Sequence, residues 1–302
     1  MFESPASFKA LFVLAAIMSL PLMAAAQANR TWVSGVGDDM NSCSRTQPCR
    51  TFAGAILKTN LAGEINVLDP GGFGGITIGK SITIDGTGTF GSILAGGTQG
   101  ILINLGASDQ AKTVRLRGLS INGMGTATDG IRIMSRGQVF IEDVVIDGVS
   151  RHGINIAASG AYVSAKNTTV RNCGKFGINL EPSGDSANAT LSIESSRVSS
   201  CEAGLFAGRG TAATVRDSAF LRNLTGVAAE GSDVALVNCM VAHGDRGLVA
   251  RANAAIRISS TTVTRNETGL GSASSGKIIS FKDNVVHGNG TDGAPTHTFP
   301  PA

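Results

Sequence analysis

The sequence predicts an all-β chain built as a β-solenoid, on three observations. A six-residue block with apolar first and last residues recurs seven times, from Ile141–Ile146 to Phe281–Val286. Glycines that open short alternating apolar runs recur 21 to 27 residues apart, at Gly130, Gly153, Gly177, Gly204, Gly226, Gly247 and Gly269. The region has no helical periodicity. A fixed period in this range is typical of a solenoid, in which each coil packs on the next.

The third position of each block predicts where the coils turn. It holds only aspartate, asparagine or serine, at Asp143, Asn167, Ser195, Asp217, Asn238, Ser260 and Asp283. These residue types bend the backbone and hydrogen-bond it locally. Forty glycines and 16% charged residues agree with short strands and tight turns. A net charge of +3 is too small to imply a nucleic-acid partner.

Residues 1–28 predict a secretory signal peptide. Lys9 precedes the apolar run Ala10–Met23, and small residues follow up to Ala28. The run is shorter than the roughly 20 residues of a membrane-spanning helix. We therefore expect cleavage after Ala28, export to the periplasm or the medium, and no membrane span in the mature chain.

Residues 29–62 predict a cap over the first coil, because an open solenoid end exposes apolar interior and unpaired strand edges. Thr31–Ser34 predicts a strand. Cys43 and Cys49 predict a disulfide in an oxidising compartment, and without a nearby histidine or second pair they make a poor metal site. Thr51 is placed as the N-cap of a short helix whose apolar face would hold Phe52, Ala53, Ile56 and Leu57.

Residues 63–293 predict about nine coils, followed by a proline-containing tail at 294–302 that we expect to be poorly ordered. Gly86–Gly91 matches the dinucleotide-binding fingerprint, but a strand and turn follow it where the fingerprint requires a helix. We therefore expect no cofactor.

Stacking the blocks predicts which residues are neighbours on successive coils. One column alternates in charge, through Arg117, Glu142, Lys166, Glu194 and Arg216. Such alternation favours one register, although each exposed pair contributes only about 0–1 kcal/mol. Cys239 falls in a column of small residues and should be a buried thiol. Cys173 and Cys201 fall on adjacent coils, within reach of a disulfide, and either a bridge or two free thiols is compatible with this placement.

A second column contains the cations that could bind a polyanion. Arg222, His243 and Arg265 lie on three consecutive coils, with Arg246 close by on a turn. Cations at this regular spacing could pair with the carboxylates of an acidic polysaccharide. The alternative is that they are solvated turn residues. His152 occupies a different turn position, where we expect a solvated side chain.

The leader, the cysteine loop Asn41–Phe52 and the Gly-Ile-x-Ile coils resemble exported bacterial proteins with a right-handed parallel β-helix, of the pectin-lyase-like group. The resemblance covers about Arg30 to Asp292 and implies a single right-handed parallel β-helix. The group includes polysaccharide lyases, hydrolases, uronate epimerases and phage tailspikes, so the fold alone does not assign a function.

The enzymes of that group provide a test for the acidic residues. Hydrolases on this fold need carboxylates grouped on neighbouring coils, and the best group here is Asp143 with Asp147 and Asp129. A calcium-dependent lyase would use Asp143 and Asp147 on the metal with Arg151 or Arg171 as base. Because the acids are sparse, we expect a non-catalytic protein that binds a surface glycan. We also expect the protein to be a monomer. The alternatives are a lyase or hydrolase of uronate-containing glycans, and a structural or adhesive scaffold.

Overall fold

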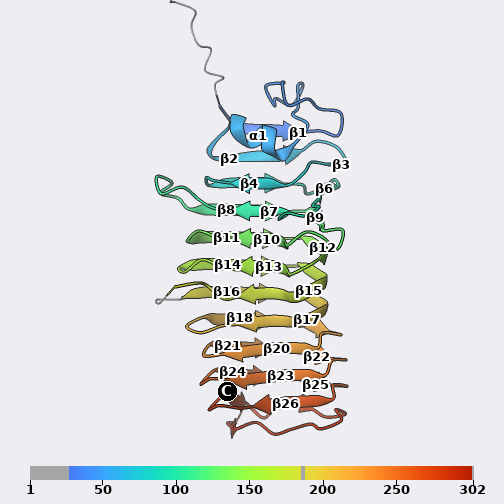
Figure 1. Cartoon of the computed structure of the whole chain (residues 1–302), viewed down its shortest axis with the longest axis vertical. Helices are drawn as coiled ribbons and strands as arrows, with labels where there is room; N and C mark the ends of the chain where they lie inside the picture. The colour runs from blue at the N-terminus through green and yellow to red at the C-terminus, as the bar shows by residue number, and fades with distance from the viewer. Residues whose placement is uncertain (1–26, 185–187, 301–302) are drawn as a thin grey trace, which may run out of the picture.

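A computed structural model, which describes residues 27–184 and 188–300, shows a parallel β-solenoid of about ten turns with one short helix at its N-terminal end (Figure 1). All its strand pairs are parallel, as the repeat predicts. The signal-peptide prediction concerns residues that lie, except for Gln27 and Ala28, outside the described part. In that part, no helix is both long and apolar enough to cross a membrane.

Each coil contributes to three faces. The first face is a twelve-stranded sheet of β1 (Ala28–Val33), β2 (Thr59–Val67), β5 (Ile82–Asp85), β8 (Thr113–Arg117), β11 (Gly137–Glu142), β14 (Ala161–Lys166), β16 (Ala189–Glu194), β18 (Ala212–Arg216), β21 (Asp233–Val237), β24 (Ala255–Ser259), β27 (Lys277–Ser280) and β29 (His297–Thr298). The second face contains β3 (Gly71–Gly72), β6 (Gly91–Leu94), β9 (Leu119–Asn122), β12 (Val145–Val149), β15 (Thr169–Leu180), β17 (Arg197–Ala207), β19 (Ala219–Leu221), β22 (Met240–Ala242), β25 (Thr262–Thr264) and β28 (Val285–Val286).

The third face, whose labels run down the middle of Figure 1, contains β4 (Ile76–Ile78), β7 (Ile101–Ile103), β10 (Asp129–Ile133), β13 (His152–Ile156), β20 (Thr225–Glu230), β23 (Arg246–Arg251) and β26 (Thr268–Ser272). The long strands β15 and β17 continue from the second face onto the third, where their last residues pair with β13 and β20.

The core is a stack of aliphatic side chains along the solenoid axis. One column of the third face runs in register through Ile131, Ile154, Ile178, Leu205, Val227, Leu248 and Leu270. All of these side chains are at least 95% buried. Burying each one contributes about 1.5–3 kcal/mol, so the interior of every coil holds its neighbours in place.

The predicted turn column is confirmed in six coils and displaced in the last. Left-handed φ values of 47° to 56° occur at Asp143, Asn167, Ser195, Asp217, Asn238 and Ser260. In the last coil the left-handed residue is Lys282, and Asp283 does not take this role. Ser280, not Phe281, pairs with Ile258, so this block contains one extra residue. The displaced Phe281 ring instead lies 6.3 Å from that of Phe299.

The alternating charge column is confirmed by the strand register. Arg117 Nε lies 3.0 Å from Glu142 Oε2, and Lys166 Nζ lies 3.6 Å from Glu194 Oε1. The column also extends one coil further, because Arg117 Nη1 lies 3.4 Å from Asp85 Oδ2.

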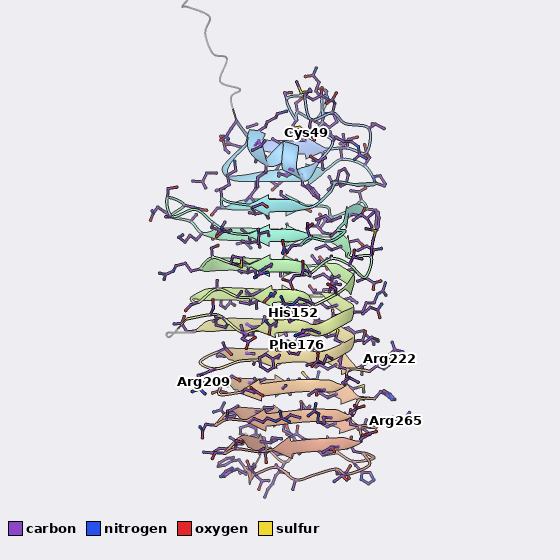
Figure 2. The ribbon with its side chains drawn as sticks, viewed as in Figure 1. Cys49, His152, Phe176, Arg209, Arg222 and Arg265 are labelled. Carbon is purple, nitrogen blue, oxygen red and sulfur yellow. A yellow bond between two sulfur atoms is a disulfide. The ribbon has the colours of Figure 1, made fainter. Side chains whose placement is uncertain are left out.

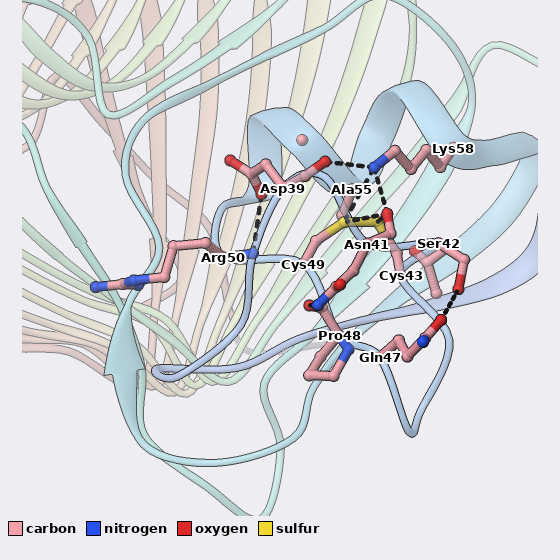
Figure 3. Close-up of a disulfide and its surroundings, with 12 residues drawn as sticks. Asp39, Asn41, Ser42, Cys43, Gln47, Pro48, Cys49, Arg50, Ala55 and Lys58 are labelled. Atoms are coloured by element: carbon pink, nitrogen blue, oxygen red, sulfur yellow. Dashed lines mark hydrogen bonds between the residues drawn. A yellow bond between two sulfur atoms is a disulfide. The ribbon is translucent and has the colours of Figure 1, made fainter.

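The N-terminal cap has the predicted parts (Figure 3). Cys43 and Cys49 form a disulfide. The helix α1 (Phe52–Lys58) begins where expected, because Thr51 Oγ1 accepts a hydrogen bond from the Gly54 N–H at 2.9 Å. Lys58 Nζ donates to main-chain carbonyls of the cysteine loop and ties that loop to the helix.

The apolar face of the helix differs from the prediction. The buried residues are Phe52, Ala55 and Ile56, whereas Ala53 and Leu57 point outward. The reason is the direction set by Phe52, whose ring packs 5.2 Å from that of Phe73 under the helix. This contact rotates Leu57 into solvent.

The described part of the tail, residues 294–300, pairs with the last coil through β29 (His297–Thr298). β29 extends the first face beyond β27, and Thr291 forms a bridge with Thr268. The Phe299 N–H donates to the Ser280 carbonyl at 2.9 Å. The tail supplies hydrogen bonds to an edge that would otherwise be unpaired.

Candidate functional site

The predicted cations follow three consecutive strands of the second face. Arg222, His243 and Arg265 come directly after β19, β22 and β25, with φ values of 56°, 63° and 56°. The same position on other coils holds Gly148, Asn172, Ser200 and Gly288, also at positive φ. A left-handed conformation costs most residues with a side chain roughly 1–2 kcal/mol, and glycine very little. The cations therefore occupy a left-handed position at which glycine or asparagine is more common.

Two of these cations, Arg222 and His243, line a surface hollow of about 380 Å³ together with Arg197 and Leu221. Figure 2 shows Arg222 and Arg265 at the same edge of the solenoid, on different coils. We call Arg197, Arg222, His243 and Arg265 the cation strip. All four are exposed, and within residues 27–184 and 188–300 no ion pair or side-chain hydrogen bond involves them. The strip is therefore free to pair with an external anion.

Arg246 is separate from the cation strip. It begins β23 on the third face, where it borders two other hollows together with Val249 and Arg251. The sequence grouped it with His243 because the two are three residues apart. The chain turns from the second face to the third between them.

The predicted acidic residues do not form one group. Asp143 accepts a hydrogen bond from Asn167 Nδ2. Asp147 is paired with Arg171, whose Nη2 lies 2.9 Å from Asp147 Oδ2, and with Asn172. Across the described residues there is no cluster of three or more histidine, cysteine, aspartate or glutamate side chains that could hold a metal ion.

Asp129 instead begins a buried polar row on the third face. Its Oδ1 accepts from the His152 main-chain N–H at 3.3 Å, and its Oδ2 accepts from Asn155 Nδ2 at 3.1 Å. Asn155 Oδ1 in turn accepts from Asn179 Nδ2 at 3.1 Å. Asp129 is fully buried, and Arg132 Nη1 lies 3.7 Å from its Oδ2. We call Asp129, His152, Asn155 and Asn179 the polar row.

The prediction that His152 is solvated is wrong, because only 3% of this residue is exposed. Its ring packs 5.2 Å from that of Phe176 on the next coil, and Nε2 lies 3.4 Å from Arg151 Nη2. The sequence contained a signal for this placement. Asp129, His152 and Phe176 each precede the glycine that opens a coil, so they form one column.

The surroundings of His152 keep its imidazole neutral. Burial lowers the pKa of His152 from 6.5 to about 4, and Asp129 opposes this shift, while Arg151, Lys175 and Arg132 add to it. Among the described residues, neither His152 Nδ1 nor Asn179 Oδ1, both buried, has a hydrogen-bond partner.

The three remaining cysteines are free, buried thiols. Cys173 and Cys201 are register partners on adjacent coils, as predicted, and the structure does not bridge them. A hydrogen bond with Cys201, together with burial, raises the pKa of the Cys173 thiol. Cys239 lies in the predicted column of small residues, where its N–H donates to Thr261 Oγ1 at 3.4 Å.

Comparisons with known proteins agree with this architecture. The family described as a right-handed β-helix region matches residues 74–220 and 183–297. A search of the curated proteins finds no match.

Three solved structures share the fold at low identity. The bacteriophage CBA120 tailspike protein 2 enzymatically active domain has a TM-score of 0.59 at 14% identity over 75% of this chain, which spans 39% of the tailspike chain. The pectate lyase Pel9A has a TM-score of 0.51 at 14% identity, covering 86% of this chain and 73% of its own. A rhamnogalacturonan lyase has a TM-score of 0.53 at 13% identity, and the match covers 78% of this chain and 74% of the lyase chain.

Proposed function

The chain belongs to the right-handed β-helix family, and from this premise we propose that it is an exported protein that binds an acidic polysaccharide without altering it. The observation that carries the proposal is the cation strip, whose four side chains have no partner among the described residues. Three of them, Arg197, Arg222 and His243, line a hollow of about 380 Å³.

The geometry of the strip suits an extended polyanion. Parallel strands place equivalent residues of successive coils about 4.8 Å apart, so Arg222, His243 and Arg265 form a line along the solenoid axis. Guanidinium groups bind carboxylates through charge-assisted, often bidentate hydrogen bonds. Because the strip is exposed, this binding should weaken as salt screens the charges.

The neighbours in fold support the choice of ligand class. A pectate lyase and a rhamnogalacturonan lyase are by name enzymes that act on polysaccharides. At identities of 13% and 14% the likeness extends to the fold alone. The ligand is therefore assigned from the cations of this chain.

Binding is preferred over catalysis because the candidate acids and bases are not presented to a substrate together. A general acid or base must come within hydrogen-bond reach of the proton that it transfers. Asp129 and His152 are buried, and Asp147 is neutralised by Arg171. A lyase or hydrolase of uronate-containing glycans is the second candidate, and the exposed carboxylate of Asp143 is the observation that favours it.

A co-sedimentation experiment tests the proposal. The chain from Asn29 onward would be incubated with insoluble, cross-linked polygalacturonate, and with dextran as the neutral control, with and without calcium. We expect the protein to be retained on polygalacturonate and not on dextran. Retention should be lost in the double variant Arg222→Gln with Arg265→Gln. It should persist in Arg209→Gln with Arg216→Gln, which removes the same charge elsewhere; Figure 2 shows Arg209 at the opposite edge.

Mass spectrometry of the supernatant distinguishes the alternatives. Shortened sugar chains that disappear in Asp143→Asn would establish a lyase or hydrolase and contradict the proposal. Neither retention nor products would point to a structural or adhesive scaffold.

A further inference from the structure

The outer surface of the third face changes character after Phe206. The outward-facing column runs in register through Arg132, Asn155, Asn179, Phe206, Ala228, Val249 and Gly271. Its first four side chains are large or hydrogen-bonding, and its last three are small. The step from large to small leaves open surface above β20, β23 and β26, which lie one below another in Figure 1.

That surface is hollowed in two adjoining places, with volumes of about 50 and 150 Å³. Both hollows are lined by Arg246, Val249 and Arg251, so they form one shallow trough. Its floor includes Ala228, Val249 and Gly271. A Cβ placed on Gly271 would meet only the Leu248 carbonyl oxygen, at 3.9 Å, which shows that the space above the floor is empty.

Two arginines stand at the sides of the trough. Arg246 begins β23 and Arg251 ends it, about 16 Å apart along an extended strand. Arg251 Nη1 lies 3.9 Å from Glu230 Oε1, which is a loose contact between half-exposed side chains. Arg246 is exposed, and its guanidinium has no ion pair or hydrogen bond within the described chain. The unneutralised charge in the trough is therefore that of Arg246.

Phe206 lies on the coil before the trough, in the same outward-facing column as Ala228. One face of its ring stacks on Phe176, with centroids 4.9 Å apart and planes 19° apart. On the other side its register partner is Ala228, whose methyl group cannot cover a ring. The ring is only half-buried, so part of its apolar surface is exposed next to the coil that holds Ala228.

We propose that this trough is a second glycan subsite, which takes one sugar ring carrying a carboxylate. The C–H face of the ring packs against the floor and Phe206, and the carboxylate pairs with Arg246 through charge-assisted hydrogen bonds. A volume near 150 Å³ suits one ring, since sites for larger ligands measure about 300–1,000 Å³. The choice of an acidic glycan rests on the proposed function, whereas the site itself is separate from the cation strip.

Isothermal titration calorimetry with trigalacturonate tests the subsite. The fully methyl-esterified trimer, which carries no charge, is the control ligand. We expect the chain to bind trigalacturonate and to bind the ester at least about tenfold more weakly, the loss typical of one charge-assisted hydrogen bond. Arg246→Gln should weaken trigalacturonate binding by a similar factor, and Arg216→Gln should leave it unchanged.

A second pair of variants tests the shape of the trough. Gly271→Leu should fill the space above the floor of the trough and abolish trimer binding. Its control is Ala235→Leu, which adds the same side chain on the outward side of β21 on the first face. Urea unfolding of each variant checks that the fold is intact. If Gly271→Leu is destabilised, Arg246→Gln alone carries the test, because Arg246 is exposed.

The outcomes separate this inference from the proposed function. Retention on the polymer without trimer binding would overturn the subsite and leave the function standing. Trimer binding that is lost in Arg246→Gln, combined with polymer retention that is unchanged in the cation-strip variant, would support the subsite and overturn the cation strip as the polymer-binding site. Equal trimer binding by all variants would overturn the subsite.

Discussion

At the scale of single residues, backbone conformation determines where each coil turns. Asp217 has a φ of 52°, and its Oδ1 accepts from Asn238 Nδ2 at 2.6 Å. Replacing it with either valine or glycine removes this hydrogen bond, but only valine must adopt a strained conformation. We predict that Asp217→Val is less stable than Asp217→Gly by about 1–2 kcal/mol.

Urea unfolding of the two variants measures this difference. Thr214→Val is the control, because Thr214 is exposed on β18 at an ordinary strand conformation. Equal stability of Asp217→Val and Asp217→Gly would contradict the account of the turn.

His152 gives a prediction for pH dependence. In the unfolded chain an imidazole takes up a proton near pH 6.5, and in the folded chain His152 does so only near pH 4. Between these values the unfolded state holds more protons, so stability is fully present above pH 6.5 and is lost as the pH falls toward 4. An NMR titration should find His152 still neutral at pH 5. Protonation of His152 near pH 6.5 would show that the polar row is solvated.

At the scale of elements, asparagines join the coils along the second face. Asn266 Oδ1 accepts from the Gly244 N–H at 3.0 Å, and its Nδ2 donates to the Val241 carbonyl at 3.2 Å. Asn266→Ala would leave buried main-chain groups unpaired, at about 1–3 kcal/mol each. We predict a loss of at least about 2 kcal/mol in thermal or urea unfolding. Thr262→Ala on the same coil should cost less than about 0.5 kcal/mol, and a similar cost for both would refute the role of Asn266.

The helix α1 gives a matched pair of variants. Phe52 is fully buried under the cap, and Leu57 of the same helix is 73% exposed. Phe52→Ala should reduce the free energy of unfolding by about 3–5 kcal/mol. Leu57→Ala should change it by less than about 0.5 kcal/mol. Comparable losses in differential scanning calorimetry would mean that the helix packs through a different face.

At the scale of the whole molecule, the repeat explains how much the sequence could predict. Strand register follows from the blocks because each coil aligns apolar residues with apolar residues, so the charge column and the neighbouring thiols were predictable. The extra residue before Val286 was not, because Phe281 satisfies the apolar pattern while packing against the tail.

The candidate sites were less predictable than the coils. Residue spacing predicted Arg222, His243 and Arg265 of the cation strip, but it missed Arg197 and wrongly included Arg246. The burial of His152 depends on Phe176 and on the corner between faces, which the blocks do not describe. The trough depends on the small size of Ala228, Val249 and Gly271, side chains that carry no functional signature in a sequence.

The left-handed cations allow the most direct test of the proposed function. The double variant Arg222→Gly with Arg265→Gly removes two charges of the cation strip and relieves two strained conformations, at φ values of 56° and 56°. Affinity for polygalacturonate and the free energy of unfolding would be measured on the same samples. We predict that affinity falls at least about tenfold while stability is unchanged or rises by about 1–2 kcal/mol. A variant that is equally stable and binds the polymer as tightly as the original chain would contradict the assignment of the cation strip as the binding site.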